Sequence, residues 1–200
     1  MGLVGWILIF LGTVMIHEVA HGAVAYLCGD RTAKIMGRLS LNPLKHIDWF
    51  WTVAFPAMLF ISTGGRFMIG MAKPVPVNFS ALHHPKRDMI WVALAGPLAN
   101  VVLAKFLLVG YQLTGFIFFL YGVYFSLGLA VFNMLPIPPL DGSRVAAGLL
   151  PRPLDYYYLK TEPYGFLIVM VLYFTGFVYY WIIPGINLLA QFLNAPMMRL

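Results

Sequence analysis

The chain has 200 residues, of which 61% are hydrophobic and only 10% charged, whereas a soluble domain is about 25% charged. This composition excludes an ordinary water-soluble protein and indicates a membrane protein. The length suits one domain, residues 1–200, without an added soluble sensor or peptide-binding module. The net charge is +6, which in a membrane protein favours basic cytoplasmic loops. The sequence contains no extended run of basic residues, and this argues against a nucleic-acid-binding surface. A single cysteine, Cys28, excludes an intramolecular disulfide and a multi-thiolate metal site.

Apolar stretches long enough to cross a bilayer, about 20 residues each, dominate the sequence. Four of them are predicted spans, at residues 3–27, 89–110, 116–135 and 164–183. A fifth, residues 49–72, contains Pro56 and the pair Gly64–Gly65, so it is either a span or a re-entrant hairpin. The sequence therefore predicts an all-α polytopic membrane protein.

Basic residues gather in three loops, and the connection 111–115 carries no charge. The three sets are Arg31, Lys34, Arg38 and Lys45; Lys73, Lys86 and Arg87; and Arg144, Arg152 and Lys160. If residues 49–72 return to the face that they leave, all three loops lie together in the cytoplasm, as the positive-inside rule requires. The charges therefore favour the hairpin, with the amino terminus outside.

The first predicted span contains a chemical motif, HEVAH at residues 17–21. Residues four apart lie on one face of a helix, so His17 and His21 can bind one metal ion while Glu18 addresses a water molecule on it. Ionisable residues inside a membrane span are costly and usually functional. A buried polar cluster that joins helices, or part of an ion pathway, is the alternative. His46, His83 and His84 lie in polar loops and are expected to be solvated.

A catalytic zinc ion needs a third protein ligand and an open position. Residues 133–142, NMLPIPPLDG, end the third predicted core span, where three prolines must unwind the helix. Asp141 is the acidic residue of this stretch and the best oxygen ligand. It could instead cap a helix beginning at Ser143.

These motifs together resemble the site-2 proteases, the zinc metalloproteases of regulated intramembrane proteolysis. The matching stretches, in order, are HEVAHG at 17–22, AGPLAN at 95–100 and NMLPIPPLDG at 133–142, with LSLNPLKHID at 39–48 and AKPVPVN at 72–78. The compact prokaryotic branch without a PDZ domain is the most similar. Members of that branch often have proline where this chain has Trp49.

The resemblance implies a single metalloprotease domain with a three-helix catalytic core, one Zn²⁺ per chain, and a site near the cytosolic side of a prokaryotic plasma membrane. It assigns the metal to His17, His21 and Asp141 and the general base to Glu18. Asn133 would bind the substrate backbone or the oxyanion, although it could instead hold helices together. Gly96 and Asn100 would support the site.

A transmembrane substrate must be unwound before water can attack it, and an edge strand could hold the unwound segment. If residues 73–78 form an extended strand, Pro74 and Pro76 remove backbone hydrogen-bond donors from only one edge of that strand. The other side keeps the residues predicted to bind substrate, which are Lys73, Val75 and Val77. A small cytosolic sheet over residues 31–41 is expected beside this edge, and a proline-rich surface loop is the alternative.

The leading functional hypothesis is an intramembrane zinc endopeptidase, whose partners are a transmembrane protein substrate and the lipid bilayer. A membrane metal or ion transporter could use the same polar residues, and an inactive homologue could bind helices as a scaffold. Glu18 separates the first two, because a transporter needs ligands whereas a hydrolase also needs a base that is not a ligand. The sequence does not fix the oligomeric state.

Overall fold

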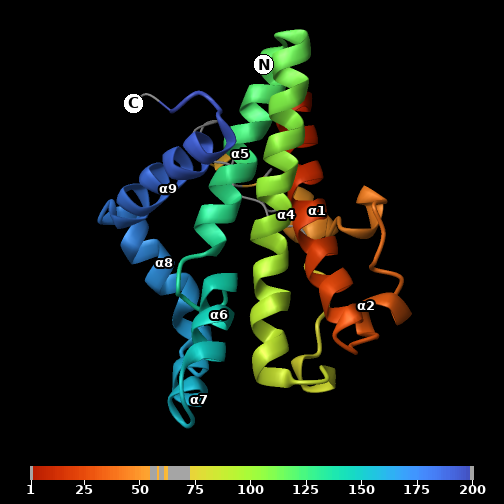
Figure 1. The fold of residues 1–200 in the computed structure, drawn as a ribbon, viewed down its shortest axis with the longest axis vertical. Helices are drawn as coiled ribbons and strands as arrows, with labels where there is room; N and C mark the ends of the chain where they lie inside the picture. The colour runs from red at the N-terminus through yellow and green to blue at the C-terminus, as the bar shows by residue number, and fades with distance from the viewer. Residues whose placement is uncertain (1, 55–57, 59–60, 63–72, 199–200) are drawn as a thin grey trace.

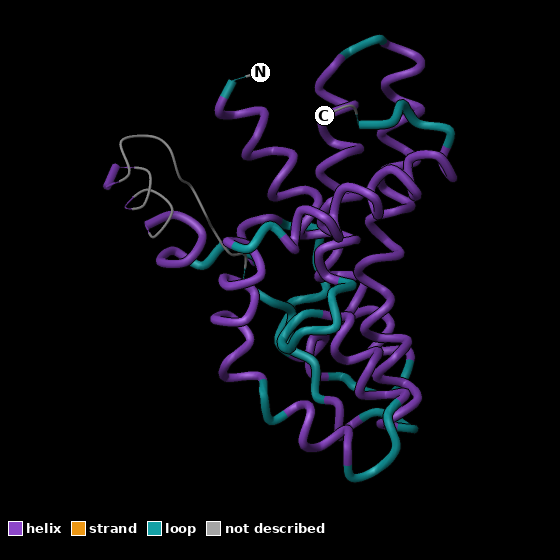
Figure 2. Tube along the Cα trace, turned by 90° about the vertical axis from the view of Figure 1, so that its left-hand side faces the viewer, coloured by secondary structure: helices purple, strands orange, loops and turns teal. Residues whose placement is uncertain are grey.

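The structure, a computed structural model, describes residues 2–54, 58, 61–62 and 73–198. Within these ranges every regular element is helical, as the tube in Figure 2 shows. The all-α prediction is therefore confirmed for this part of the chain, but the predicted small cytosolic sheet is not found in it. Residues 73–78 form no regular secondary structure and pair with no described strand.

The stretch predicted as a sheet, residues 31–41, instead begins with a short helix, α2, Thr32–Ile35. The Asp30 carboxylate accepts hydrogen bonds from the Thr32 amide at 2.9 Å and from its hydroxyl at 2.5 Å. An aspartate that bonds to the residue two positions later favours a turn or helix start over a strand. Gly37, at φ 64°, then turns the chain with a conformation that glycine adopts easily.

Three helices form the centre of the molecule: α1, Leu3–Leu27; α4, Pro85–Thr114; and α5, Ile117–Asn133. They overlap the predicted core spans 3–27, 89–110 and 116–135, and α4 packs against both of the others. Gly115, at φ 66°, closes the short turn between α4 and α5. By length and composition, α1 over Val4–Leu27 and α4 can each cross a membrane.

Helix α5 has 17 residues, or about 26 Å at 1.5 Å per residue, which is less than the roughly 30 Å hydrocarbon core. Pro136 and the prolines after it prevent the helix from continuing. The chain then passes through an irregular stretch to α6, Asp141–Leu149. Such backbone is tolerated at membrane depth when protein buries it.

The carboxyl-terminal part contains α7, Leu154–Leu159; α8, Gly165–Phe174; and α9, Phe177–Leu193. The predicted span 164–183 is not one straight helix, because the pair α7–α8 and α9 is bent by 82° at Gly176, whose φ is 78°. Helix α9 packs on α5, and together they bury an apolar cluster that includes Leu127, Val131, Ile186 and Ala190.

Figure 1 shows the start of α1 and the α4–α5 turn at one end of the long axis, and α2, α6 and α7 at the other. The helical turns η1, Pro43–Lys45, η3, Phe79–Ala81, and η4, Glu162–Tyr164, join the longer helices. A π-helix, Trp49–Ala54, opens the apolar stretch 49–72. Most of that stretch, and with it the choice between span and hairpin, lies outside the described residues.

Candidate metal centre

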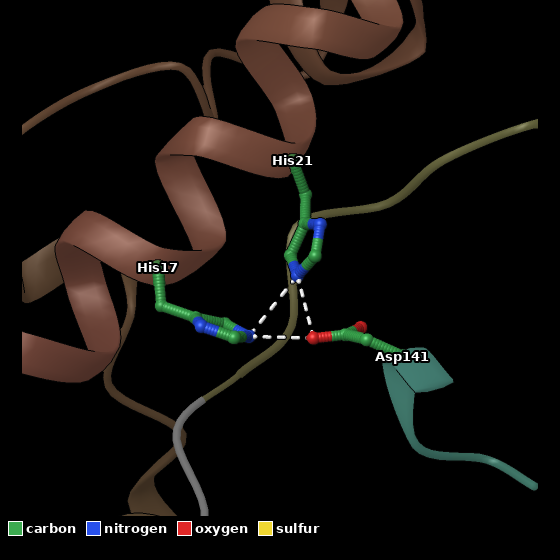
Figure 3. Close-up of side chains that lie close together, drawn as sticks. All are labelled: His17, His21 and Asp141. Atoms are coloured by element: carbon green, nitrogen blue, oxygen red, sulfur yellow. Dashed lines mark hydrogen bonds and ion pairs between the residues drawn. The ribbon is translucent and has the colours of Figure 1, made fainter. Parts of the chain in front are cut away.

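Two histidines on consecutive turns of α1 form one side of the site. His17 and His21 are only 4% and 8% exposed, and their Nε2 atoms lie 3.0 Å apart. Figure 3 shows both rings directed away from α1 toward a common point. By helix rise, His21 lies about 9 Å and His17 about 15 Å from the carboxyl end of α1. The pair therefore lies in the half of α1 that faces the α2 end of the molecule.

Asp141 completes the site from the start of α6. Its Oδ2 atom lies 3.1 Å from Nε2 of His17 and 3.3 Å from Nε2 of His21 (Figure 3). The N-cap of α6 is Leu140, and no side chain caps this helix. The carboxylate of Asp141 is thus directed at the imidazoles and does not cap a helix.

The chain holds Asp141 in place through two glycines of α6. A Cβ atom on Gly142 would lie 2.3 Å from the Met134 carbonyl oxygen, so the turn after the prolines admits only glycine there. A Cβ atom on Gly148 would lie 2.3 Å from the Ile90 side chain, so α6 packs closely on α4. Nearby, Arg144 pairs with Glu162 at 2.6 Å.

The three atoms fit a single metal ion. A tetrahedral zinc ion with bonds of about 2.0–2.1 Å separates its ligand atoms by about 3.3 Å, and the observed separations are 3.0, 3.1 and 3.3 Å. Among the described residues, this is the group of histidine, cysteine and acidic side chains that could share an ion. Two nitrogens and one carboxylate oxygen are also a common donor set of catalytic zinc sites.

Gly96 of α4 leaves the space that the two rings occupy. A Cβ atom at this position would lie 2.4 Å from His21 Nε2 and 2.6 Å from His17 Cε1. No side chain fits there unless both rings move.

The other ring nitrogens are held by α4. His21 Nδ1 lies 2.6 Å from the carbonyl oxygen of Val92, which can only accept, so Nδ1 carries the proton and Nε2 is free to bind a cation. His17 Nδ1 lies 3.1 Å from the amide of the fully buried Asn100, whose Oδ1 has no hydrogen-bond partner. The oxygen and nitrogen of this side-chain amide are nearly equal in shape, and when they exchange places Oδ1 accepts the proton of His17 Nδ1. Nε2 of His17 is then free to bind a cation, as it is in His21.

Glu18 is placed beside the site by a contact that the sequence does not reveal. Its Oε2 accepts a hydrogen bond from the Val75 amide at 2.7 Å. The Val75 side chain is buried against Gly22, where a Cβ atom would lie 2.7 Å from Val75 Cγ1. Segment 73–78 therefore contacts α1 next to the motif.

The predicted substrate-binding residues differ in their surroundings. The Lys73 amide donates to the His46 carbonyl at 2.9 Å, so it and the Val75 amide already have partners within the chain. The Val77 amide has no partner among the described residues. The side-chain amide of Asn133 donates to the carbonyl of Leu129 on its own helix at 3.0 Å, and no hydrogen bond among the described residues joins it to the three candidate ligands.

Three polar residues around segment 73–78 are buried, which the sequence analysis did not predict. His46, expected to be solvated, is 1% exposed, with its Nε2 2.7 Å from the Ser40 carbonyl. His83 and His84 are exposed as expected. Arg38 is 8% exposed and Asp30 is fully buried. Burial alone would raise the pKa of Asp30, but hydrogen bonds from Thr32 and from the Asn78 amide outweigh it and lower the pKa.

The chain is similar to known proteins over most of its length. Residues 5–117 match the model described as "Peptidase family M50". The chain is 39% identical over 185 residues to "Putative zinc metalloprotease YwhC" of Bacillus subtilis, covering 86% of this chain and 80% of that protein. It is 31% identical over 183 residues to "Putative zinc metalloprotease Rip2" of Mycolicibacterium smegmatis, covering 86% and 65%. No solved structure shows significant similarity.

Proposed function

The chain belongs to peptidase family M50, the site-2 proteases, and we propose that it is a zinc-dependent intramembrane endopeptidase. It hydrolyses peptide bonds within or near transmembrane segments of membrane proteins, as in regulated intramembrane proteolysis. The observation that carries the proposal is the convergence of His17, His21 and Asp141 from segments 120 residues apart beside Glu18. Glu18 lies outside this ligand set and is therefore available as a base.

The roles follow from the donors that each residue presents. His17 Nε2, His21 Nε2 and Asp141 Oδ2 hold one Zn²⁺ per chain, which when bound polarises the scissile carbonyl and lowers the pKa of water to about 7. The Glu18 carboxylate accepts a proton from the attacking water and passes it to the leaving amine. Val92 and Asn100 keep the two rings oriented, and Gly96 makes room for them.

Substrate presentation is assigned to segment 73–78. Because the Lys73 and Val75 amides have intramolecular partners, the edge available to a substrate is smaller than the sequence predicts. It consists of the Val75 carbonyl and the Val77 backbone, which have no partner among the described residues. A single residue of a parallel strand can bond to both the Val75 carbonyl and the Val77 amide. Asn133, at the end of α5, remains the candidate for contacting the substrate backbone.

The bilayer is the proposed setting, because α1 and α4 are each long and apolar enough to cross it. We place the amino terminus outside a prokaryotic plasma membrane and the α2, α6 and α7 end in the cytoplasm, since the basic loops belong to that end. The site then lies within the membrane, toward the cytosolic face.

Purified protein in liposomes with a model transmembrane substrate tests this proposal. We expect zinc-dependent products that mass spectrometry maps to bonds within or next to the substrate span. A transporter predicts zinc flux across the liposome membrane without cleavage, and a scaffold predicts substrate binding without either. Each of those results would contradict the proposal.

A further inference from the structure

Arg38 is a buried cation without an acidic partner. Its side chain is 8% exposed, and no ion pair involves it in the described part of the chain. The guanidinium donates instead to three backbone carbonyls. Nη1 bonds to Lys45, and Nη2 bonds to Lys73 at 2.8 Å and to Pro74 at 3.2 Å. Burying a charge is unfavourable unless it is well compensated, so this arrangement points to a specific role.

The two carbonyls at 73 and 74 belong to consecutive peptide groups. Pro74 has no amide hydrogen, so a neighbouring strand could not pair with residue 74 itself through a backbone donor. Arg38 supplies the missing connection, because a guanidinium has several donors in a rigid plane. The Lys73 amide is fixed as well, by the His46 carbonyl. The chain therefore enters position 75 with little freedom.

The next residue is the one that contacts the catalytic motif. The Val75 amide donates to Glu18 Oε2 at 2.7 Å, a charge-assisted bond. Three residues later, the Asn78 amide donates to Asp30 Oδ2 at 2.7 Å, which holds the other end of the segment. Between these two contacts lie the unpartnered backbone groups of Val75 and Val77.

We propose that Arg38 is a positioning residue for proteolysis, which sets the register of segment 73–78 against Glu18. The register determines which peptide bond of a paired substrate reaches that carboxylate. Arg38 touches neither the candidate ligands nor, in this proposal, the substrate; it acts through the Lys73 and Pro74 carbonyls. The inference rests on the proposed protease function.

The first test needs no activity. Hydrogen exchange of the peptide containing Val75 is compared in wild type, Arg38→Ala, Arg38→Lys and the control Arg31→Ala. Arg31 belongs to the same loop but is exposed, and its side chain makes no hydrogen bond with the described residues. We expect exchange about tenfold faster in Arg38→Ala, less so in Arg38→Lys, and unchanged in Arg31→Ala. Equal exchange in Arg38→Ala and wild type would contradict the proposal.

The second test reads the cleavage position. We expect Arg38→Ala to keep its zinc but to lower kcat about tenfold and to spread cleavage over neighbouring bonds of a transmembrane substrate. Arg38→Lys should partly restore the wild-type pattern. A wild-type cleavage site in Arg38→Ala, or a uniform loss of activity together with zinc, would show that Arg38 does not set the register. A zinc-loaded wild type that cleaves no substrate would instead contradict the proposed function.

Discussion

The amide of Val75 donates a hydrogen bond to the carboxylate of Glu18 at 2.7 Å, across 57 positions of sequence. This contact joins the HEVAH motif of α1 to segment 73–78, which follows the apolar stretch 49–72. The carboxylate that we assign as the base is therefore oriented by the same segment that we assign to the substrate. Orientation of the base and presentation of the substrate are coupled in this arrangement.

Replacing Val75 with proline tests this coupling. Proline removes the amide hydrogen that Glu18 accepts, while the metal ligands are untouched. We expect cleavage of an intact transmembrane substrate to be lost, with zinc content unchanged by metal analysis. The control Val75→Ala keeps the amide and loses only buried methyl groups, so it should retain most activity. Unaffected cleavage in Val75→Pro would show that segment 73–78 neither orients Glu18 nor presents the substrate.

Gly96 is expected to tolerate no side chain. In Gly96→Ala the new Cβ atom would lie 2.4 Å from His21 Nε2, so both rings must shift and metal binding should fall to near background. The matched control is Gly12→Ala on α1, where a Cβ atom would meet nothing within 4 Å. Metal analysis of the purified variants makes the comparison. Full zinc content in Gly96→Ala would show that the two rings are not confined as described.

Asn100 is expected to tune zinc affinity through His17. Removing its side chain in Asn100→Ala deprives His17 Nδ1 of its partner, and losses of such outer contacts typically weaken metal binding about 10–100-fold. Asn100→Asp keeps an oxygen acceptor at this position and should bind zinc more tightly than Asn100→Ala. Competition with a chelator measures both affinities. Equal affinity in Asn100→Ala and wild type would contradict this role.

We expect the hydrogen bonds of Asp30 to make the stability of the fold depend on pH. Its pKa is lowered in the folded chain, so its hydrogen bonds stabilise the fold above the ordinary aspartate pKa of about 3.9. This stabilisation is lost as the pH falls below that value toward the lowered pKa. We expect Asp30→Asn to reduce the free energy of unfolding by about 1–3 kcal/mol at pH 7.

Thermal unfolding in detergent, followed from pH 7 to pH 3, measures this effect. The difference between wild type and Asp30→Asn should shrink as the solution becomes more acidic. A difference that stays constant over this range would mean that Asp30 ionisation does not stabilise the fold.

Apolar length predicts the long helices well, because burial in lipid or protein leaves few alternatives for such segments. Helix α1 has the predicted bounds, Leu3–Leu27, and α5 ends two residues early, ahead of Pro136. The motif spacing also predicts which side chains the fold brings together. His17 and His21 are one helical turn apart, and Asp141 is the acidic residue of the unwound stretch.

The features that the sequence did not predict depend on contacts that residue spacing does not encode. The charge pattern places Arg38 among the basic residues of a loop. In the structure its side chain is buried and donates hydrogen bonds to backbone carbonyls at three other positions. The residues around α2 were expected to form a sheet, whereas Asp30 starts a helix there through local hydrogen bonds. The break at Gly176 divides an apolar stretch whose composition alone predicts a continuous span.

The most direct test of the central claim is Glu18→Gln, assayed for zinc content and for cleavage of a transmembrane substrate in the same preparation. Glutamine keeps the size of the side chain and an oxygen for the Val75 amide but cannot take up a proton as a base. We expect wild-type zinc content and a loss of cleavage. Persistent proteolysis in this variant, or loss of zinc along with activity, would contradict the assignment of Glu18 as the base.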